Sequence, residues 1–474
     1  MSETGVKNNN KPDGSRKVIY LMEYPIDLPG GGQMSTRTLC EGIIAGAEEM
    51  IRSEERPDRR DLKITPKRTV CRQTGAEEIH DPKRTIWEPV VICPALLTHK
   101  AEDYPFRILE YKALENREDA LIPRLINFAG RIRHFARLIR QEKPDLIHVS
   151  MSESLLTYGF SRLLPGLSKY PFIYTDRGLC YGYRRHTKLL MRAILKRSEG
   201  MICTTQYNKD LWVKEEMIRS EKRPDRHDLK IMPKRTICKQ IGAEKMIRSE
   251  KRPIKITVIP NTISEVFSRY EEGKRELMRK RFGLSKEDFV VGFAGRISEE
   301  KDWGFVPVLV KALKEAGVSF KVALVISVYE KQDTAIAAEI RKGITDSIGG
   351  DALIYMQDLS QEEISDYYYM LDVFVMSSMF ESFGKAAVEA MSRKCPVVST
   401  SVGGLKEVVG KEENLYTKND LSRFTDRIKR LSEDKDELER DREFFYQRYL
   451  DNYTLKKHIQ KHVALYDDIV EGNT

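Results

Sequence analysis

The sequence lacks the marks of a membrane, disulfide-stabilised or zinc protein. Its 474 residues hold seven cysteines, an odd number, and no two of them form a C-x2-C pair. This usage predicts reduced thiols and argues against a disulfide framework or a zinc site. The apolar runs are too short to span a bilayer, and residues 1–17 lack the apolar core of a signal peptide. We therefore expect a soluble, cytoplasmic protein in which residues 1–17 form a disordered N-terminus.

Familiar phosphate-binding motifs are also missing. No P-loop of the form G-x4-G-K-[ST] occurs. The glycine-rich stretch at residues 29–33 is no dinucleotide fingerprint, because Ser35 stands where G-x-G-x-x-G requires its third glycine. No D-x-D motif with acidic neighbours follows an expected strand, where a divalent ion could bridge a diphosphate. A nucleotide ligand would therefore have to be held in another way.

What the chain does contain is an alternation of strands and helices. Hydrophobic residues make up 41% and charged residues 32% of the chain, whose length allows two or three domains. Short apolar segments alternate with helical patterns, which predicts parallel sheets. Strands are expected at residues 18–24, 88–93, 145–151, 171–175, 200–204 and 255–260 in the first half, and at 289–295, 320–328, 352–356, 372–376 and 396–400 in the second.

The strongest functional signal is the segment ESFGKAAVE, which runs from Glu381 to Glu389. The apolar residues 373–376 before it predict a buried strand. Glu381 would then stand at the carboxyl end of that strand, where ligands of parallel α/β sheets bind, and Glu389 about two turns along the next helix. Ser382 could cap this helix, and Gly384 would let backbone approach a ligand. The alternative is an ordinary helix with two solvated glutamates.

Two cations follow another expected strand, at residues 289–295. Arg296 and Lys301 stand just past its end. Such a pair can hold a diphosphate, the arginine through its planar fork and the lysine as a point charge. The alternative is a loop with two surface cations.

Three glycines follow the first expected strand. Gly30, Gly31 and Gly32 precede a helix and would let several backbone amides converge on a phosphate. A flexible turn explains the same residues equally well.

These three segments resemble the GT4 family of retaining, nucleotide-sugar-dependent glycosyltransferases. The segment from Glu381 resembles the E-x7-E signature of that family, the cations resemble its G-R-x4-K motif, and the glycines resemble its first loop. The resemblance implies an α/β fold of the GT-B class, with two Rossmann-like parallel-sheet domains that face a central cleft. The implied domains are residues 18–262 for the acceptor, with a C-terminal helix at 454–470 packing back on them, and residues 285–446 for the nucleotide-sugar donor.

The resemblance also implies roles for single residues. Arg296 and Lys301 would neutralise the leaving nucleoside diphosphate, so that neither a metal nor another cofactor is needed. Glu381 would orient the donor sugar, and Glu389 would bind the ribose hydroxyls. The other implied substrate-binding residues are Gly31, Gly32, Ser382, Phe383 and Gly384.

One expected residue is absent. GT4 enzymes often place a histidine after a strand of the N-terminal domain, but the comparable stretch YTDRG at residues 174–178 has none. Either Asp176 or Arg177 fills this catalytic role, or activity is weakened.

The implied reaction is transfer of a sugar from a nucleotide sugar to a glycan or lipid-linked acceptor of the cell envelope, as in lipopolysaccharide or polysaccharide biosynthesis. A sugar-nucleotide epimerase and a catalytically inactive binding protein, both of the GT-B fold, are the alternatives. The helix expected at residues 121–142 is basic and amphipathic, so peripheral contact with an anionic membrane at the inner face of the cell membrane stays open. A core-packed helix with a solvated basic face is the simpler interpretation.

The chain also carries a repeat. Residues 48–79 and 215–246 align without a gap and share 24 of 32 positions, and residues 246–253 repeat 217–224 letter for letter. The copies resemble in-frame palindromic mobile elements, and we interpret 48–79 and 215–253 as passive insertions at loops. A nucleic-acid-binding arm is the alternative, since residues 215–253 have a net charge of +5, against +9 for the whole chain. Interleaved aromatic residues are absent there, so no nucleic acid partner is expected.

Overall fold

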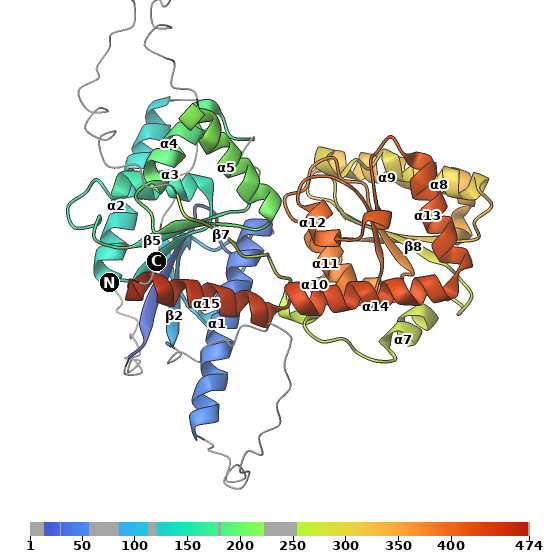
Figure 1. Cartoon of the computed structure of the whole chain (residues 1–474), viewed down its shortest axis with the longest axis horizontal. Coiled ribbons are helices and arrows are strands. Elements are labelled where there is room, and N and C mark those ends of the chain that lie inside the picture. The colour runs from blue at the N-terminus through green and yellow to red at the C-terminus, as the bar shows by residue number, and fades with distance from the viewer. Residues whose placement is uncertain are drawn as a thin grey trace, which may run out of the picture. The chain divides into compact units, whose positions relative to one another are not determined.

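The structure is a computed structural model. The described chain forms two sheets flanked by helices (Figure 1), which confirms the predicted pair of Rossmann-like parallel sheets. It divides into two compact units, residues 1–173 with 459–474 and residues 174–458. The residues that the structure describes are 14–28, 30–55, 85–111, 121–178, 182–221 and 254–472.

The first sheet has the strand order β3-β2-β1-β4-β5-β6-β7. Its registered strand pairs are parallel. The order changes direction between β1 and β4, which makes the carboxyl ends of these two strands a switch point of the sheet. The strands are β1 (Arg16–Leu21), β2 (Trp87–Pro94), β3 (Arg107–Tyr111), β4 (Leu146–Val149), β5 (Phe172–Asp176), β6 (Gly200–Cys203) and β7 (Ile256–Val258). The helices are α1 (Gly31–Glu55), α2 (Leu121–Glu142), α3 (Ser152–Ser161), α4 (Arg185–Leu195) and α5 (Gln206–Glu221).

The last helix, α15 (Leu455–Glu471), packs against the first strands of this sheet. The hydroxyl of Tyr466 lies 2.8 Å from the hydroxyl of Tyr20 on β1 and 2.6 Å from Nδ1 of His148 on β4. The indole N–H of Trp87 on β2 donates to Asp467 at 2.9 Å. Because buried polar groups need partners, these bonds fix how the helix sits on the sheet.

The second sheet has the order β10-β9-β8-β11-β12-β13, and its registered pairs are parallel. It too changes direction once, between β8 and β11. The strands are β8 (Val290–Arg296), β9 (Lys321–Ser327), β10 (Leu353–Gln357), β11 (Val373–Met376), β12 (Val397–Thr400) and β13 (Leu415–Tyr416). The helices are α7 (Lys274–Arg281), α8 (Phe305–Glu315), α9 (Lys331–Ile348), α10 (Gln361–Met370), α11 (Lys385–Ser392), α12 (Leu405–Val409), α13 (Leu421–Glu433) and α14 (Lys435–Asn452).

Both faces of the second sheet are covered. On β11, Val373 and Val375 join a core with α8, α9 and α13, whereas Phe374 and Met376 join a second core with α10, α11 and α14. Successive strand residues point to opposite faces, so a strand buried on both sides must be apolar at every position. This requirement explains the uninterrupted apolar runs in the sequence.

The structure departs from the expected elements in a few places. β1 begins at Arg16, so the expected disordered segment 1–17 is wrong at its end, and residues 1–13 lie outside the described part. Strands β3 and β13 were not predicted. β3 is a partly exposed edge strand in which charged residues interrupt the apolar ones, and β13 has only two residues.

The repeats begin inside helices. α1 continues to Glu55 and α5 to Glu221, so each copy first prolongs the preceding helix with the sequence EEMIRSE. The remainder of both copies, residues 56–79 and 222–253, lies outside the described residues. Among the helices that are described, none combines the length and the apolar character needed to cross a membrane.

Candidate active site

The carboxyl ends of β8 and β11 meet where the second sheet reverses its strand order. Open α/β sheets bind their ligands at such a point, because the loops diverge there. A small pocket opens at this edge. It is lined by side chains of both strands and their loops, including Phe293, Lys301, Trp303, Met376 and Ser377.

The structure brings two of the predicted catalytic residues into direct contact. Nζ of Lys301, in the loop after β8, lies 2.8 Å from Oε2 of Glu381, in the loop after β11. The two side chains are only 23% and 18% exposed, so solvent screens this ion pair less than one on the open surface. Ser377 also ties the loops together, since its hydroxyl donates to the carbonyl of Lys301 at 2.8 Å.

Arg296 is the last residue of β8 and stands at the same edge. Its side chain is 61% exposed and its Nη2 lies 3.7 Å from Oε2 of Glu300. Its carbonyl accepts a hydrogen bond from the indole N–H of Trp303 at 2.9 Å, which fixes the backbone of the loop. The backbone of Arg296 is therefore held in place, while its guanidinium group extends into solvent.

Close backbone packing holds the loop that carries Glu381. The N–H of Gly404 donates to the carbonyl of Glu381 at 2.9 Å. A Cβ on Gly403 would lie 2.1 Å from that carbonyl oxygen, and one on Gly404 would lie 2.1 Å from the carbonyl oxygen of Ser382. Gly384 has φ +92°, and a Cβ there would meet Leu405 at 2.5 Å. Glycine is thus required on both sides of this contact.

The helix after this loop begins later than expected. Gly384 is the N-cap of α11 and Ser382 makes no capping bond, so the predicted cap is wrong. Because α11 begins at Lys385, Glu389 lies about one turn into the helix rather than two. Phe383 is buried and its ring packs edge-on against Tyr453 at 5.7 Å, which leaves only its backbone for a ligand.

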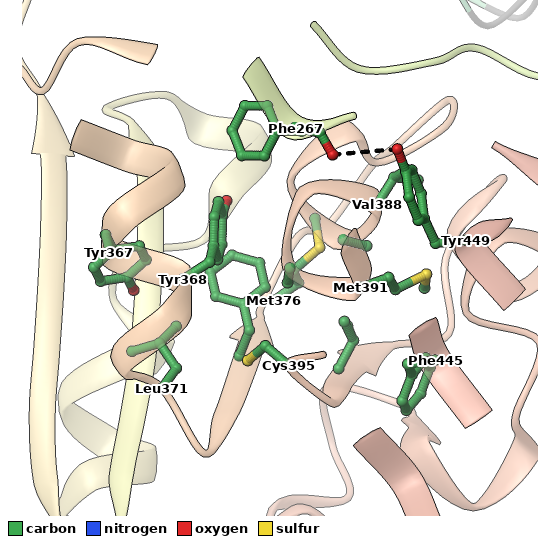
Figure 2. Close-up of a cluster of buried hydrophobic side chains, with 14 of the residues drawn as sticks. Phe267, Tyr367, Tyr368, Leu371, Met376, Val388, Met391, Cys395, Phe445 and Tyr449 are labelled. Atoms are coloured by element: carbon green, nitrogen blue, oxygen red, sulfur yellow. Dashed lines mark hydrogen bonds between the residues drawn. The ribbon is translucent and has the colours of Figure 1, made fainter. Parts of the chain in front are cut away.

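Glu389 sits above the core on one face of the sheet. The hydroxyl of Tyr368 donates to Oε2 of Glu389 at 3.1 Å. Figure 2 shows Tyr368 near Met376, in the same apolar cluster as Val388. Burial raises the pKa of Glu389, and the positive charge of Lys385 opposes this shift.

Several site residues were not predicted. Burial lowers the pKa of Lys385 to about 8, and this residue and Glu389 are one helical turn apart. Tyr368, Gly403 and Gly404 were missed as well. The paired glycines shortly after β12 were a usable signal for a close backbone contact, whereas nothing local marked Tyr368 as a partner of Glu389.

The predicted glycines of the first sheet lie in other surroundings. Gly31 and Gly32 begin α1 at the carboxyl end of β1, and their carbonyls accept bonds from the hydroxyls of Ser35 and Thr36 at 2.7 and 3.0 Å. A Cβ on Gly31 would meet open space. Steric crowding therefore does not require the glycine at position 31.

Asp176 ends β5 and is fully buried. Its carboxylate accepts hydrogen bonds from the indole of Trp212 at 2.6 Å and from the hydroxyls of Tyr183 and Tyr174 at 2.9 and 3.2 Å. Burial raises the pKa of Asp176. This geometry favours a structural role over proton transfer. Arg177 beside it donates to the side-chain oxygen of Asn261 at 3.0 Å.

The described residues offer no cluster of potential metal ligands. Across the described residues, no three His, Cys, Asp or Glu side chains gather as ligands. The positive charges of the candidate site come from Arg296, Lys301 and Lys385, and Arg177 lies near enough to Lys385 for its charge to help lower the pKa of that lysine.

Two family models match the chain. Residues 84–222 match "Glycosyltransferase Family 4", and residues 274–448 match "Glycosyl transferases group 1". Both matches name glycosyltransferases. The second match contains Arg296, Lys301, Glu381 and Glu389, so the candidate site lies inside it.

Curated relatives agree with this assignment over part of their length. The chain is 35% identical over 157 residues to a 2-deoxystreptamine glucosyltransferase of Streptomyces kanamyceticus, which covers 33% of this chain and 39% of that protein. It is 30% identical over 183 residues to D-inositol 3-phosphate glycosyltransferase 1 of Catenulispora acidiphila. This alignment covers 38% of this chain and 43% of that protein. The chain thus spans less than half the length of these relatives. These relatives, like both family models, are named as glycosyltransferases.

Solved structures share the fold. Anabaena Alr3699/HepE in complex with UDP and glucose superposes with a TM-score of 0.62 at 15% identity, over 95% of this chain and 99% of that one. Sucrose-phosphate synthase from Thermosynechococcus elongatus gives a TM-score of 0.65 at 16% identity, over 96% and 100%. At this identity the likeness shows the fold alone, and it confirms the predicted GT-B class.

Proposed function

We propose that the chain is a retaining glycosyltransferase that takes a sugar from a nucleotide-sugar donor bound at the carboxyl edge of the second sheet. The observation that carries this proposal is the contact between Lys301 and Glu381 at the switch point between β8 and β11. Two residues eighty positions apart meet there in a partly buried ion pair. An ion pair of this kind can separate to bind a diphosphate and a sugar hydroxyl at once.

The positive charges would act on the leaving group. When the bond between the anomeric carbon and the diphosphate oxygen breaks, the electron pair stays on that oxygen. Lys301 and Arg296 would stabilise this developing negative charge. Stabilisation of developing charge by groups already in position is usually a large part of catalysis. The acceptor hydroxyl oxygen would form the new bond on the same face, and its proton would pass to the departing phosphate oxygen. The reaction would need no metal.

The carboxylates would hold the donor. Glu381 would accept bonds from the sugar hydroxyls and Glu389 from the ribose hydroxyls. Tyr368 already fixes one oxygen of Glu389, which leaves the other for a ligand. Ser382, Phe383 and Gly384 would offer backbone groups to the same ligand.

The donor and acceptor partners are part of the proposal. HepE was solved with UDP and glucose, which makes UDP-glucose the first donor to try. The named relatives act on a cyclitol and on an inositol phosphate, and we propose a glycan or lipid-linked acceptor of the cell envelope as the counterpart here.

Peripheral contact with an anionic membrane would go through α2. Its Arg133, Arg137 and Arg140 are exposed, while Phe135 and Ile139 are buried. A basic face of this kind can rest on anionic lipid while the apolar face stays in the core.

A turnover assay with product analysis tests the function. The purified chain is incubated with UDP-glucose and sugar acceptors, and the products are separated. Release of UDP with a glycosylated product that keeps the donor's anomeric configuration supports a retaining transferase. An epimerised donor without an acceptor would identify an epimerase, and no conversion of any nucleotide sugar would favour an inactive binding protein.

Variants connect the activity to the site. Lys301→Ala, Glu381→Ala and Arg296→Ala should each lower turnover by about one to two orders of magnitude, the size of a lost charge-assisted contact. The matched control is Lys321→Ala. Lys321 pairs with Asp288 at 3.2 Å with similar exposure, but at the opposite end of the strands. Near-normal rates in all three site variants would overturn the assignment.

A further inference from the structure

Helix α4 carries a second apolar surface on its outer side. Its inner side is an ordinary core face, because Met191, Ile194 and Leu195 are buried. Leu189 and Leu190 do not belong to that face and are 48% and 36% exposed. A surface helix normally needs only one apolar stripe, the one that packs on its sheet. The two leucines are therefore left over after α4 has been anchored.

The fold keeps these leucines on the outside. Each residue turns a helix by about 100°, so Leu189 lies nearly opposite the buried side formed by Met191, Ile194 and Leu195. Ala193, one turn after Leu189, is exposed as well. Rotating α4 to cover Leu189 would expose the three core side chains, so the outer surface stays available for a partner.

Cations surround the exposed leucines. Residues 184–197 hold six lysines and arginines and no acidic residue. Arg185, Lys196 and Arg197 are exposed and lie on the same side of the helix as Leu189. Within the described part of the chain, none of these three side chains forms an ion pair. Free cations beside exposed leucines predict a partner that is both anionic and apolar.

Another basic helix shows that this combination is not a general feature of the fold. α7 also has an exposed leucine, Leu277. Its Arg275 and Arg279, however, are paired with Asp372 at 2.6 and 3.0 Å. Part of the positive charge of α7 is thus used inside the fold, whereas the cations on the outer side of α4 remain available to an external anion.

An anionic lipid surface has both of the required properties. Its headgroup phosphates attract lysine and arginine, and the boundary between headgroups and acyl chains accepts leucine side chains. A nucleic acid offers the charge but no apolar layer in which leucines could be buried. Because the inner side of α4 is packed in the core, the helix would lie on such a surface and not cross it.

We propose that α4 binds an anionic membrane surface through its outer side. Leu189 and Leu190 enter the boundary between headgroups and acyl chains, while Arg185, Lys196 and Arg197 contact lipid phosphates. This inference deepens the membrane contact proposed above, because it adds an apolar anchor on a second helix to the charge of α2. It rests on the proposed function only in that a lipid-linked acceptor would give such an anchor a purpose.

Vesicle co-sedimentation with the full chain tests the proposal. The probes are vesicles of phosphatidylcholine alone and of phosphatidylcholine mixed with phosphatidylglycerol. The wild type should bind the mixed vesicles at least tenfold more tightly, and added salt should weaken this binding. Leu189→Ser combined with Leu190→Ser should weaken it at least tenfold, because binding scales with the apolar area that is buried. The combined variant Arg185→Gln, Lys196→Gln and Arg197→Gln should do the same by removing charge.

A tryptophan at position 189 reports insertion directly. The native Trp87, Trp212 and Trp303 are buried, so their fluorescence should change little on binding. In Leu189→Trp, mixed vesicles should shift the emission to shorter wavelength, and brominated lipids should quench it. Emission that stays as in buffer while the protein is bound would show that α4 does not insert.

The matched control is Leu277→Ser combined with Val308→Ser. It removes two aliphatic side chains, 58% and 50% exposed, from α7 and α8, and it should bind vesicles like the wild type. A second comparison uses Arg133→Gln with Arg137→Gln on α2. This variant should weaken the attraction at low salt but leave the fluorescence shift of Leu189→Trp in place.

Three outcomes would overturn the proposal: no binding of the wild type to mixed vesicles, equal loss of binding in the control pair and the leucine pair, or loss in the α2 variant alone. UDP affinity is measured in the same samples, and each variant should retain it. If the wild type binds UDP but no vesicles, this inference alone is wrong. Vesicle binding without nucleotide binding would support the role of α4 and contradict the proposed function.

Discussion

Replacing Gly404 with alanine should displace the loop that carries Glu381 without touching any charged group. The backbone of Gly404 has φ −75° and ψ −13°, which alanine adopts readily, so the change adds no backbone strain. The new Cβ would, however, lie 2.1 Å from the carbonyl oxygen of Ser382 and 2.9 Å from its carbon. Those atoms belong to backbone and cannot rotate away as a side chain can.

The size of the effect follows from this contact. Van der Waals contact requires a separation of about 3.4 Å, so the loop must retreat by about 1 Å, and a displacement of that order can cost about 100-fold in rate. The overpacked contact should also lower the free energy of unfolding by about 1–3 kcal/mol. We therefore expect donor turnover (kcat/KM) to fall by about two orders of magnitude while the protein still folds.

Gly350→Ala is the control for this experiment. A Cβ on Gly350 would meet nothing within 4 Å, and that residue lies in a short helical turn before β10. Steady-state kinetics and thermal melting are measured for both variants. Equal kcat/KM values for Gly404→Ala and Gly350→Ala would refute the argument that the packing of this loop sets the position of Glu381.

Three further predictions concern metal dependence, the repeats and pH. Turnover should survive an excess of EDTA, because Arg296 and Lys301 supply the positive charge, and loss that magnesium or manganese restores would contradict this. Deleting residues 48–79 and 215–253, with short Gly/Ser joins, should shift the melting temperature by only a few degrees and leave UDP affinity unchanged. The reason is that neither range contains a described strand or a site residue. An insoluble variant, or nucleic-acid binding by the parent alone, would show that the repeats have a function. Burial raises the pKa of Glu23 from its ordinary value of 4.5 to about 7 in the folded chain, so the folded state holds an extra proton between these pH values. The stability contributed by this proton amounts to about 3 kcal/mol; it is complete below about pH 4.5 and is lost as the pH rises through 7. Glu23→Gln should abolish this pH dependence of the melting temperature in a series from pH 5 to 8.

The second sheet and its site were largely predictable because their signals are local. The fully apolar strand 373–376, the cations after β8 and the glutamates after β11 can each be read from adjacent residues. Parallel topology then brings the strand ends to one edge, which is why Lys301 and Glu381 could be assigned to the same site before their contact was known.

The features of the site that the sequence did not predict depend on contacts between segments that are distant in the chain. The packing of Gly404 on Ser382 and the bond from Tyr368 to Glu389 join residues about twenty positions apart, and no local pattern encodes them. The start of α11 was misjudged because Ser382 is a good capping residue, yet tertiary packing of the loop places Gly384 there instead.

The most direct test of the donor site is a calorimetric titration of UDP into the wild type, Lys301→Ala and Lys321→Ala. Both lysines form partly buried pairs with a carboxylate at an edge of the same sheet, one at the carboxyl ends of the strands and one at the amino ends. We predict that UDP binds the wild type and Lys321→Ala alike and binds Lys301→Ala at least tenfold more weakly. Equal affinity for all three proteins, or weaker binding only in Lys321→Ala, would contradict a donor site at the meeting point of β8 and β11.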